Sequence, residues 1–185
     1  MNQELAYLVS NYDFEKLQKG CKVILYSQLA DFENLTELLP TDNVCFILIK
    51  TNLNSGHWTC LNRKNNIFYY FDSYGKIFDG ELKTIDKNIK IKLHEDKYLL
   101  TPLIKKLIQN NYKVFYNNFQ YQKYDPNINT CGKWSLIFTK FIFLSTNSDN
   151  QPKTIIFKNR ILGIAKEYNI KLLDVLVSIL YDSFE

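Results

Sequence analysis

The sequence predicts an α+β fold, with a mixed central β-sheet flanked by helices. Two patterns carry this prediction. Short β-branched and aromatic runs gather in the first half of the chain, in the ranges 22–26, 44–49, 57–62 and 67–71. Apolar residues recur at helical spacing towards the end, in the ranges 131–144, 155–168 and 172–184. A strand-rich middle flanked by helices is typical of the α+β class.

A single domain is expected over residues 1–185. A length of 185 residues suits one domain, and 46% hydrophobic residues can supply its core. Six glycines and four prolines leave no stretch that reads as a long linker or a disordered tail. The polar connector 145–152 is too short to separate two domains.

The first 40 residues predict short helices around one strand. Residues 4–9 and 14–18 have helical spacing, and the β-branched run from Lys22 to Tyr26 predicts the first strand. Residues 34–39 form a helical turn that ends at Pro40, because proline cannot continue a helix.

A hairpin is predicted in the middle of the chain. Residues 44–49 are apolar at every position, which is typical of a strand buried on both faces and places it centrally in the sheet. The runs 57–62 and 67–71 are joined by Arg63-Lys64-Asn65-Asn66, and asparagine suits a tight turn between antiparallel strands.

The second half is expected to be mainly helical. Residues 76–97 are rich in lysine and match no period. Thr101-Pro102 predicts a helix to about Asn110, with threonine as N-cap and proline at the first helical position. A short strand at 113–116 and a polar loop at 117–130 precede the helix 131–144, and two amphipathic helices, 155–168 and 172–184, close the chain.

The basic residues bear on possible nucleic-acid partners. All but Arg63 and Arg160 of the 23 basic residues are lysines, and the formal net charge is +4. Sequence-specific proteins rely on bidentate arginine, so specific base readout is disfavoured. Weak, non-specific DNA binding remains open, with residues 83–106 as its first location; the alternative is a solvated lysine face.

The cysteines predict free thiols in a reducing compartment. Cys21, Cys45, Cys60 and Cys131 lie far apart, and the polar N-terminus does not read as a signal peptide. We therefore expect an intracellular protein that is not secreted. Zinc is disfavoured, since the chain has no C-x-x-C motif and two histidines, and no apolar run is long enough for a membrane span.

Cys131 is a candidate nucleophile. Asn129 and Thr130 are good N-cap types, so the thiol falls in the first turn of a helix, where unpaired N–H groups favour a thiolate. Gly132 is expected to leave the space beside the sulfur open. The alternative is a buried cysteine that packs as a small apolar residue.

His57 and Asp72 are candidates for the base and its orienting partner. His94 lies in a charged, surface-like stretch, whereas His57 opens a strand directly after a Ser-Gly loop. A turn centred on Asn65 places residues near 58 opposite residues near 71 or 72, so His57 and Asp72 share one end of the hairpin. Asp72 also begins a turn, where aspartate commonly forms purely local hydrogen bonds.

An ordered set of short motifs resembles a known superfamily. Gly56-His57-Trp58, Phe71-Asp72-Ser73-Tyr74, a glutamine-bearing segment and Thr130-Cys131-Gly132 occur in that order. The set resembles the proteases of ubiquitin-like proteins and the adenovirus-type maturation proteases, above all the capsid-maturation branch of large DNA viruses and virophages. Residues 25–29 and 45–48 also look like that viral branch, and the resemblance covers roughly residues 22–145.

The resemblance implies roles for individual residues. It implies an adenovirus-protease-like fold with Cys131 as the nucleophile at the start of a buried helix. It implies His57 as the general base and then acid, Asp72 as the orienting carboxylate, and Trp58 as the wall of the cleft. Trp58 could also be a plain core aromatic residue.

The resemblance also implies a glutamine in the oxyanion hole, together with backbone N–H groups. Gln122 lies nine residues before Cys131 and Gln120 eleven before, both farther than the family's usual gap. Asp125-Pro126 accounts for the extra length if it forms a small bulge. In an extended segment both side chains point the same way, so orientation does not choose between them, and we favour Gln122.

The expected function is that of a cysteine endopeptidase that cleaves viral capsid precursors, at glycine-containing sites as its relatives do. Two alternatives stay open: a protease acting on a host ubiquitin-like modifier, and a non-catalytic capsid-associated binding protein. No metal cofactor is expected, although relatives use DNA or an activating peptide. We expect a monomer in the viral factory of the host cytoplasm and in the virion.

Overall fold

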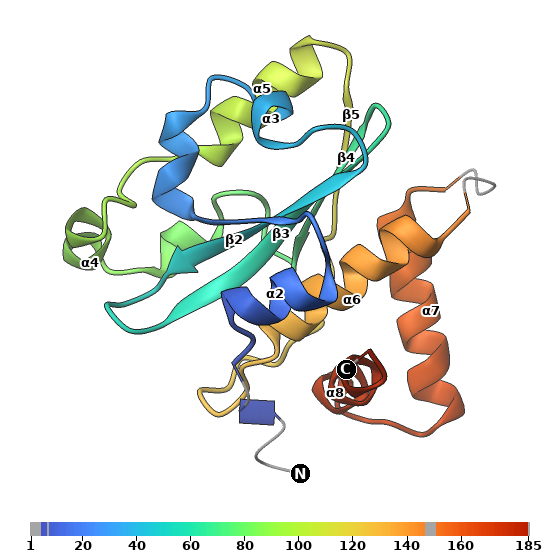
Figure 1. The fold of residues 1–185 in the computed structure, drawn as a ribbon. Coiled ribbons are helices and arrows are strands. Elements are labelled where there is room, and N and C mark those ends of the chain that lie inside the picture. The colour runs from blue at the N-terminus through green and yellow to red at the C-terminus, as the bar shows by residue number, and fades with distance from the viewer. Residues whose placement is uncertain (1–4, 7, 147–150, 185) are drawn as a thin grey trace.

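The computed structural model describes residues 5–6, 8–146 and 151–184, and its centre is a five-stranded mixed sheet (Figure 1). The strands lie in chain order: β1 (Lys22–Leu25), β2 (Asn43–Lys50), β3 (Gly56–Lys64), β4 (Ile67–Asp72) and β5 (Lys113–Tyr116). The pairs β1–β2 and β4–β5 are parallel, and the pairs β2–β3 and β3–β4 are antiparallel. The predicted α+β class with a mixed sheet is confirmed.

The β3–β4 hairpin forms where the sequence predicts it. Asn65 has a φ of 54°, a left-handed conformation that asparagine tolerates in a tight turn. In the resulting register Thr59 pairs with Asp72. The first residues of β3 and the last residue of β4 therefore lie at the same end of the sheet.

Helices cover both faces of the sheet (Figure 1). They are α2 (Asn11–Leu17), α3 (Leu35–Leu38), α4 (Lys87–Lys92), α5 (Leu100–Gln109), α6 (Cys131–Leu144), α7 (Lys153–Glu167) and α8 (Leu173–Asp182), with the 3-10 helices η1 (Tyr26–Asp31) and η2 (Glu81–Thr84). Apolar residues of α2, α6, α7 and α8 form a core with one face of the sheet. Those of α3, α5, η1 and η2 form a second core with the other face.

β2 and α6 show how burial selects these elements. Along β2, Val44 and Phe46 belong to one core while Cys45 and Ile47 belong to the other, so both faces of the strand need apolar residues. α6 contacts β3, α7 and α8, and it is buried on nearly every side. Its first residue, Cys131, is therefore held by the core.

Three predicted helix boundaries were wrong, among them the start of α2, which is Asn11 rather than residue 14. α5 begins at Leu100 rather than after Thr101, because the Asp79 carboxylate accepts hydrogen bonds from the N–H groups of Leu100 (3.1 Å) and Thr101 (2.9 Å). Of the predicted helix 4–9, residues 5 and 6 are helical and residues 8 and 9 are not, while residues 4 and 7 lie outside the described residues. Within the described ranges, no helix combines the length and apolarity that crossing a bilayer requires.

Candidate active site

His57 and Asp72 form a buried pair at one end of the hairpin. His57 is the second residue of β3 and Asp72 the last residue of β4. His57 Nε2 lies 3.0 Å from Asp72 Oδ1, and the two side chains are 5% and 0% exposed. The hairpin thus brings the carboxylate to the imidazole, as its register predicts.

The Asp72 carboxylate is held by its own turn as well. Oδ1 also accepts a hydrogen bond from the backbone N–H of Tyr74 (2.7 Å), and the Tyr74 ring stacks on the imidazole at 4.6 Å between ring centres. The buried Asn117 side chain extends the pairing of β4. Its Oδ1 accepts from the Asp72 N–H (2.9 Å), and its Nδ2 donates to the Asp72 carbonyl (2.7 Å). Both the backbone and the carboxylate of Asp72 are therefore oriented.

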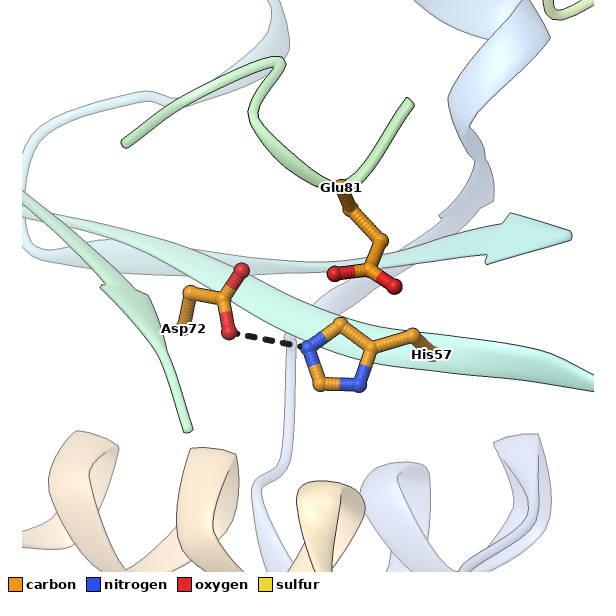
Figure 2. A group of neighbouring side chains, drawn as sticks. All are labelled: His57, Asp72 and Glu81. Atoms are coloured by element: carbon orange, nitrogen blue, oxygen red, sulfur yellow. Dashed lines mark hydrogen bonds and ion pairs between the residues drawn. The ribbon is translucent and has the colours of Figure 1, made fainter. Parts of the chain in front are cut away.

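Cys131 lines the same pocket as His57. It is the first residue of α6, is 5% exposed, and its thiol helps to raise the pKa of the His57 imidazole. Since Nε2 faces Asp72, the nitrogen that remains for the thiol is Nδ1, which Figure 2 shows turned away from Asp72. A pocket of about 720 Å³ opens here, and its lining includes His57, Trp58, Tyr74, Glu81, Gln122 and Cys131.

The pKa of His57 reflects opposing influences. Burial of the imidazole is the largest and lowers the pKa, since it disfavours the charged form. The charge and hydrogen bond of Asp72, with the contact to Cys131, outweigh it and raise the pKa well above its ordinary value. The site therefore favours an imidazolium between a carboxylate and a sulfur.

Thr130 is the N-cap residue of α6, but its side chain does not cap the helix. Its hydroxyl donates instead to the carboxylate of Asp174 in α8. Trp134 N–H donates to the Thr130 carbonyl (2.9 Å) as the first helical bond. The capping bond suggested by the residue types Asn129 and Thr130 is not formed, because Thr130 has φ −91° and ψ 3° and not the extended backbone of a capping residue.

Gln122 lines the pocket, whereas Gln120 is exposed and is not part of the lining. Gln122 Nε2 donates to Ile128 O (2.9 Å) and Tyr74 Oη (3.2 Å), and its Oε1 accepts from Ser73 Oγ (2.8 Å). The two glutamines do not point the same way, because the chain bends between them: the N–H groups of residues 121 and 122 both donate to the Ser73 carbonyl. The expected extended segment was wrong, and the bend favours Gln122.

Trp58 both borders the pocket and belongs to the core. It is 6% exposed, and its indole N–H donates to the Val9 carbonyl (3.0 Å). The open space expected beside Gly132 is absent, since a Cβ there would lie 2.6 Å from Val9 Cβ and 3.3 Å from Trp58 Cδ1. Because Gly132 has no side chain, the N-terminal segment packs directly against α6. Leu8 and Val9 of that segment line the pocket.

Comparison with known proteins places the chain in a virophage family. No family model matches the sequence. The chain is 32% identical over 141 residues to the uncharacterized protein V9 of Sputnik virophage, which covers 73% of this chain and 79% of V9. The chain belongs to the V9 family.

The fold of this V9 family member resembles two crystal structures of the ASFV pS273R protease. The selenomethionine form has a TM-score of 0.44 at 12% identity and covers 80% of this chain and 61% of the protease. The second structure has a TM-score of 0.38 at 14% identity and covers 83% and 59%. The chain therefore spans about three fifths of the length of that protease. At these identities the likeness concerns the fold alone.

Glu81 is a pocket residue of this V9 family member that the sequence analysis missed. It lies in η2, is 5% exposed, and pairs with Lys76 Nζ at 2.6 Å. Figure 2 shows its carboxylate and that of Asp72 beside the imidazole. Residues 76–97 match no period, and Glu81 reaches His57 only through the fold, so no local signal marked it.

His57, Asp72 and Glu81 could together hold a metal ion. One nitrogen and two carboxylate oxygens, all within 4.8 Å of one another, are a donor set that zinc accepts. The sequence did not suggest this grouping, because zinc motifs are local and these residues are not. Lys76 already pairs with Glu81, and the imidazole with Asp72, so the cluster is balanced in charge by protein groups.

The arrangement as a whole is suited to nucleophilic chemistry. An imidazole paired with a fully buried carboxylate lies at the pocket that the Cys131 thiol also lines. Backbone N–H groups at the start of α6 and the amide of Gln122 lie around the same pocket and can stabilise a developing oxyanion.

Proposed function

We propose that this chain is a cysteine endopeptidase that cleaves viral structural precursor proteins. One observation supports the proposal: the His57–Asp72 pair borders the pocket that Cys131 lines, and the Cys131 thiol helps to raise the pKa of that imidazole. A cysteine that served only as a small core residue would not need a buried imidazole and carboxylate directed at it.

The first step starts from an ion pair, in which the proton of the Cys131 thiol lies on His57 Nδ1 and Asp72 accepts a hydrogen bond from Nε2–H of the imidazolium. The thiolate attacks the carbonyl carbon of the scissile peptide bond. When the C–N bond breaks, Nδ1–H passes to the departing amine, and a thioester to Cys131 remains.

In the second step His57 Nδ1 takes a proton from water, and the hydroxide attacks the thioester. The C–S bond breaks, which releases the carboxylic acid product and restores the thiol. In both steps the negative oxygen accepts hydrogen bonds from the Cys131 N–H and from Gln122 Nε2, whose bond to Tyr74 at 3.2 Å is the longer of its two and the one it gives up.

Kinship with V9 supports a viral substrate, since V9 is a virophage protein. The recessed nucleophile supports a small residue at the cleavage site: Cys131 and Trp58 are 5% and 6% exposed, and a bulky side chain beside the scissile bond would meet the indole. The same proposal includes cleavage at glycine-containing sites, a monomeric protein, and a location in the viral factory and the virion.

Co-expression with candidate capsid precursors tests the proposal. Cys131→Ala is expected to abolish processing, with Cys21→Ala as the matched control. Cys21 is not among the residues that line the pocket, and burial raises the pKa of its thiol to about 11, so it is no nucleophile at neutral pH. Unchanged processing by Cys131→Ala would refute the assignment.

A ubiquitin-fold vinyl-sulfone probe separates the substrate classes. The proposal expects Cys131 to react with small alkylating agents and with glycine-containing peptide probes, but slowly with the ubiquitin-fold probe. Rapid reaction with that probe would mean that the substrate is a host ubiquitin-like modifier and not a capsid precursor. The proposed catalytic chemistry would be unaffected.

A further inference from the structure

Asp174 is a buried carboxylate outside the pocket. It lies in the first turn of α8 and is 0% exposed. Burying a carboxylate costs several kcal/mol unless hydrogen-bond donors compensate. The hydrogen-bond partners of Asp174 therefore indicate which parts of the fold this buried carboxylate holds together.

The donors to Asp174 come from two positions in the loop between β5 and α6 and from α6 itself. Oδ1 accepts from the Thr130 hydroxyl and, at 3.4 Å, from the Trp134 indole N–H. Oδ2 accepts from the backbone N–H of Lys123 at 2.9 Å. Thr130 directly precedes Cys131, and Lys123 directly follows Gln122, so one carboxylate joins the end of the loop next to the nucleophile to the part that carries the oxyanion donor.

A second contact ties the same helices together. Lys133, in the first turn of α6, is buried, and its Nζ donates to Ser178 Oγ of α8 at 3.2 Å. Ser178 in turn donates to the Asp174 carbonyl at 3.1 Å. The start of α6 is thus anchored to α8 through polar contacts of Thr130, Lys133 and Trp134.

We propose that Asp174 is a positioning residue for the peptidase site, through which the C-terminal helix α8 sets the distance between Cys131 and Gln122. The inference rests on the proposed function. It assigns α8, which contributes nothing to the pocket lining, a part in the rate of the reaction. Cys131 must attack the carbonyl carbon while Gln122 binds the carbonyl oxygen, so the two residues must be correctly placed relative to each other. A displacement of about 1 Å can lower the rate a hundredfold.

The test measures kcat and KM for a peptide substrate with Asp174→Asn and Thr130→Val, well below the unfolding temperature of each. Asp174→Asn keeps the shape but loses an acceptor, and Thr130→Val removes the donor at the other end. Both are expected to lower kcat about tenfold to a hundredfold with KM changed by less than about threefold. Thr130→Ser, which keeps the hydroxyl, is expected to restore most of kcat.

The double variant and a surface control complete the design. Because Asp174 and Thr130 act through one hydrogen bond, the double variant is expected to lose little more than the worse single variant. Asp182→Asn, an exposed change in the same helix, is expected to leave kcat unchanged.

The outcomes separate this inference from the proposed function. If the wild-type chain cleaves and both Asp174→Asn and Thr130→Val keep its kcat, the positioning role is overturned and the peptidase stands, even where the variants unfold at lower temperature. If the wild-type chain cleaves no peptide, the proposed function falls and the positioning role falls with it.

Discussion

Single side chains in this molecule serve a local turn and the pocket at once. Asp72 Oδ1 accepts from the Tyr74 N–H and from His57 Nε2, and a carboxylate oxygen has room for both donors. The two interpretations of Asp72, a local turn residue and a partner of the imidazole, are therefore compatible. The local bond aims the carboxylate, so the turn is part of the site's geometry.

Glu95 provides a prediction about pH and stability. It is 1% exposed, with Oε1 accepting from the Lys50 N–H at 3.2 Å, and burial raises its pKa from 4.5 to about 7. A raised pKa means that the folded state binds the proton more tightly than the unfolded state does. The contribution to stability is present below pH 4.5 and is lost as pH rises through about 7.

Glu95→Gln removes this titration. The wild type is expected to lose about 2 kcal/mol of its free energy of unfolding between pH 5 and pH 8 through this group, and the variant is not. The variant is therefore expected to be more stable relative to the wild type at pH 8 than at pH 5. Urea unfolding at the two pH values measures the difference, and Glu167→Gln, at an exposed position of α7, is the control. An equal effect of Glu95→Gln at both pH values would contradict the raised pKa.

At the scale of elements, the sequence predicted what depends on neighbours along the chain. Strand alternation, the asparagine turn and the apolar spacing of α6 are local, and these elements form where expected. α5 starts at Leu100 because Asp79, 21 residues earlier, caps it. The bend that separates Gln120 from Gln122 depends on the Ser73 carbonyl. Asp79, Glu81 and Asp174 act across the fold, so spacing could not reveal them.

Gly132→Ala tests how α6 meets the N-terminal segment. The new Cβ would lie 2.6 Å from Val9 Cβ, so Val9 and the pocket wall that it forms must move. We expect a loss of about 1–3 kcal/mol in the free energy of unfolding and a higher KM for peptide substrates. Denaturant unfolding and steady-state kinetics measure the two effects.

Gly163→Ala is the matched control for that change. Gly163 lies inside α7, and a Cβ there meets nothing within 4 Å. Alanine favours a helix over glycine, so this variant should be more stable than the wild type by about 0.5–1 kcal/mol. If Gly132→Ala behaved like Gly163→Ala, the close packing against Val9 would be disproved.

At the scale of the whole molecule, the C-terminal helices close the core that holds α6. Phe157 of α7 is 2% exposed and packs against Phe138 of α6 (5.1 Å between ring centres), Tyr121 (5.4 Å) and Phe71 of β4 (5.9 Å). One aromatic ring thus joins α7 to α6, to the glutamine loop and to the sheet. The sheet and the C-terminal helices are therefore expected to unfold together.

Phe157→Ala tests this cooperativity. A buried phenylalanine replaced by alanine leaves a cavity among these rings, and we expect a loss of about 3–5 kcal/mol in the free energy of unfolding. Leu162→Ala, on the outer side of α7 at 38% exposure, should cost less than about 1 kcal/mol.

Because Trp58 and Trp134 report on the core and far-UV circular dichroism reports on all helices, both signals should change at one denaturant concentration in each variant. An earlier loss of helix signal, with the tryptophan signal retained, would mean that α7 and α8 unfold separately from the sheet. The C-terminal helices could not then hold the site in register.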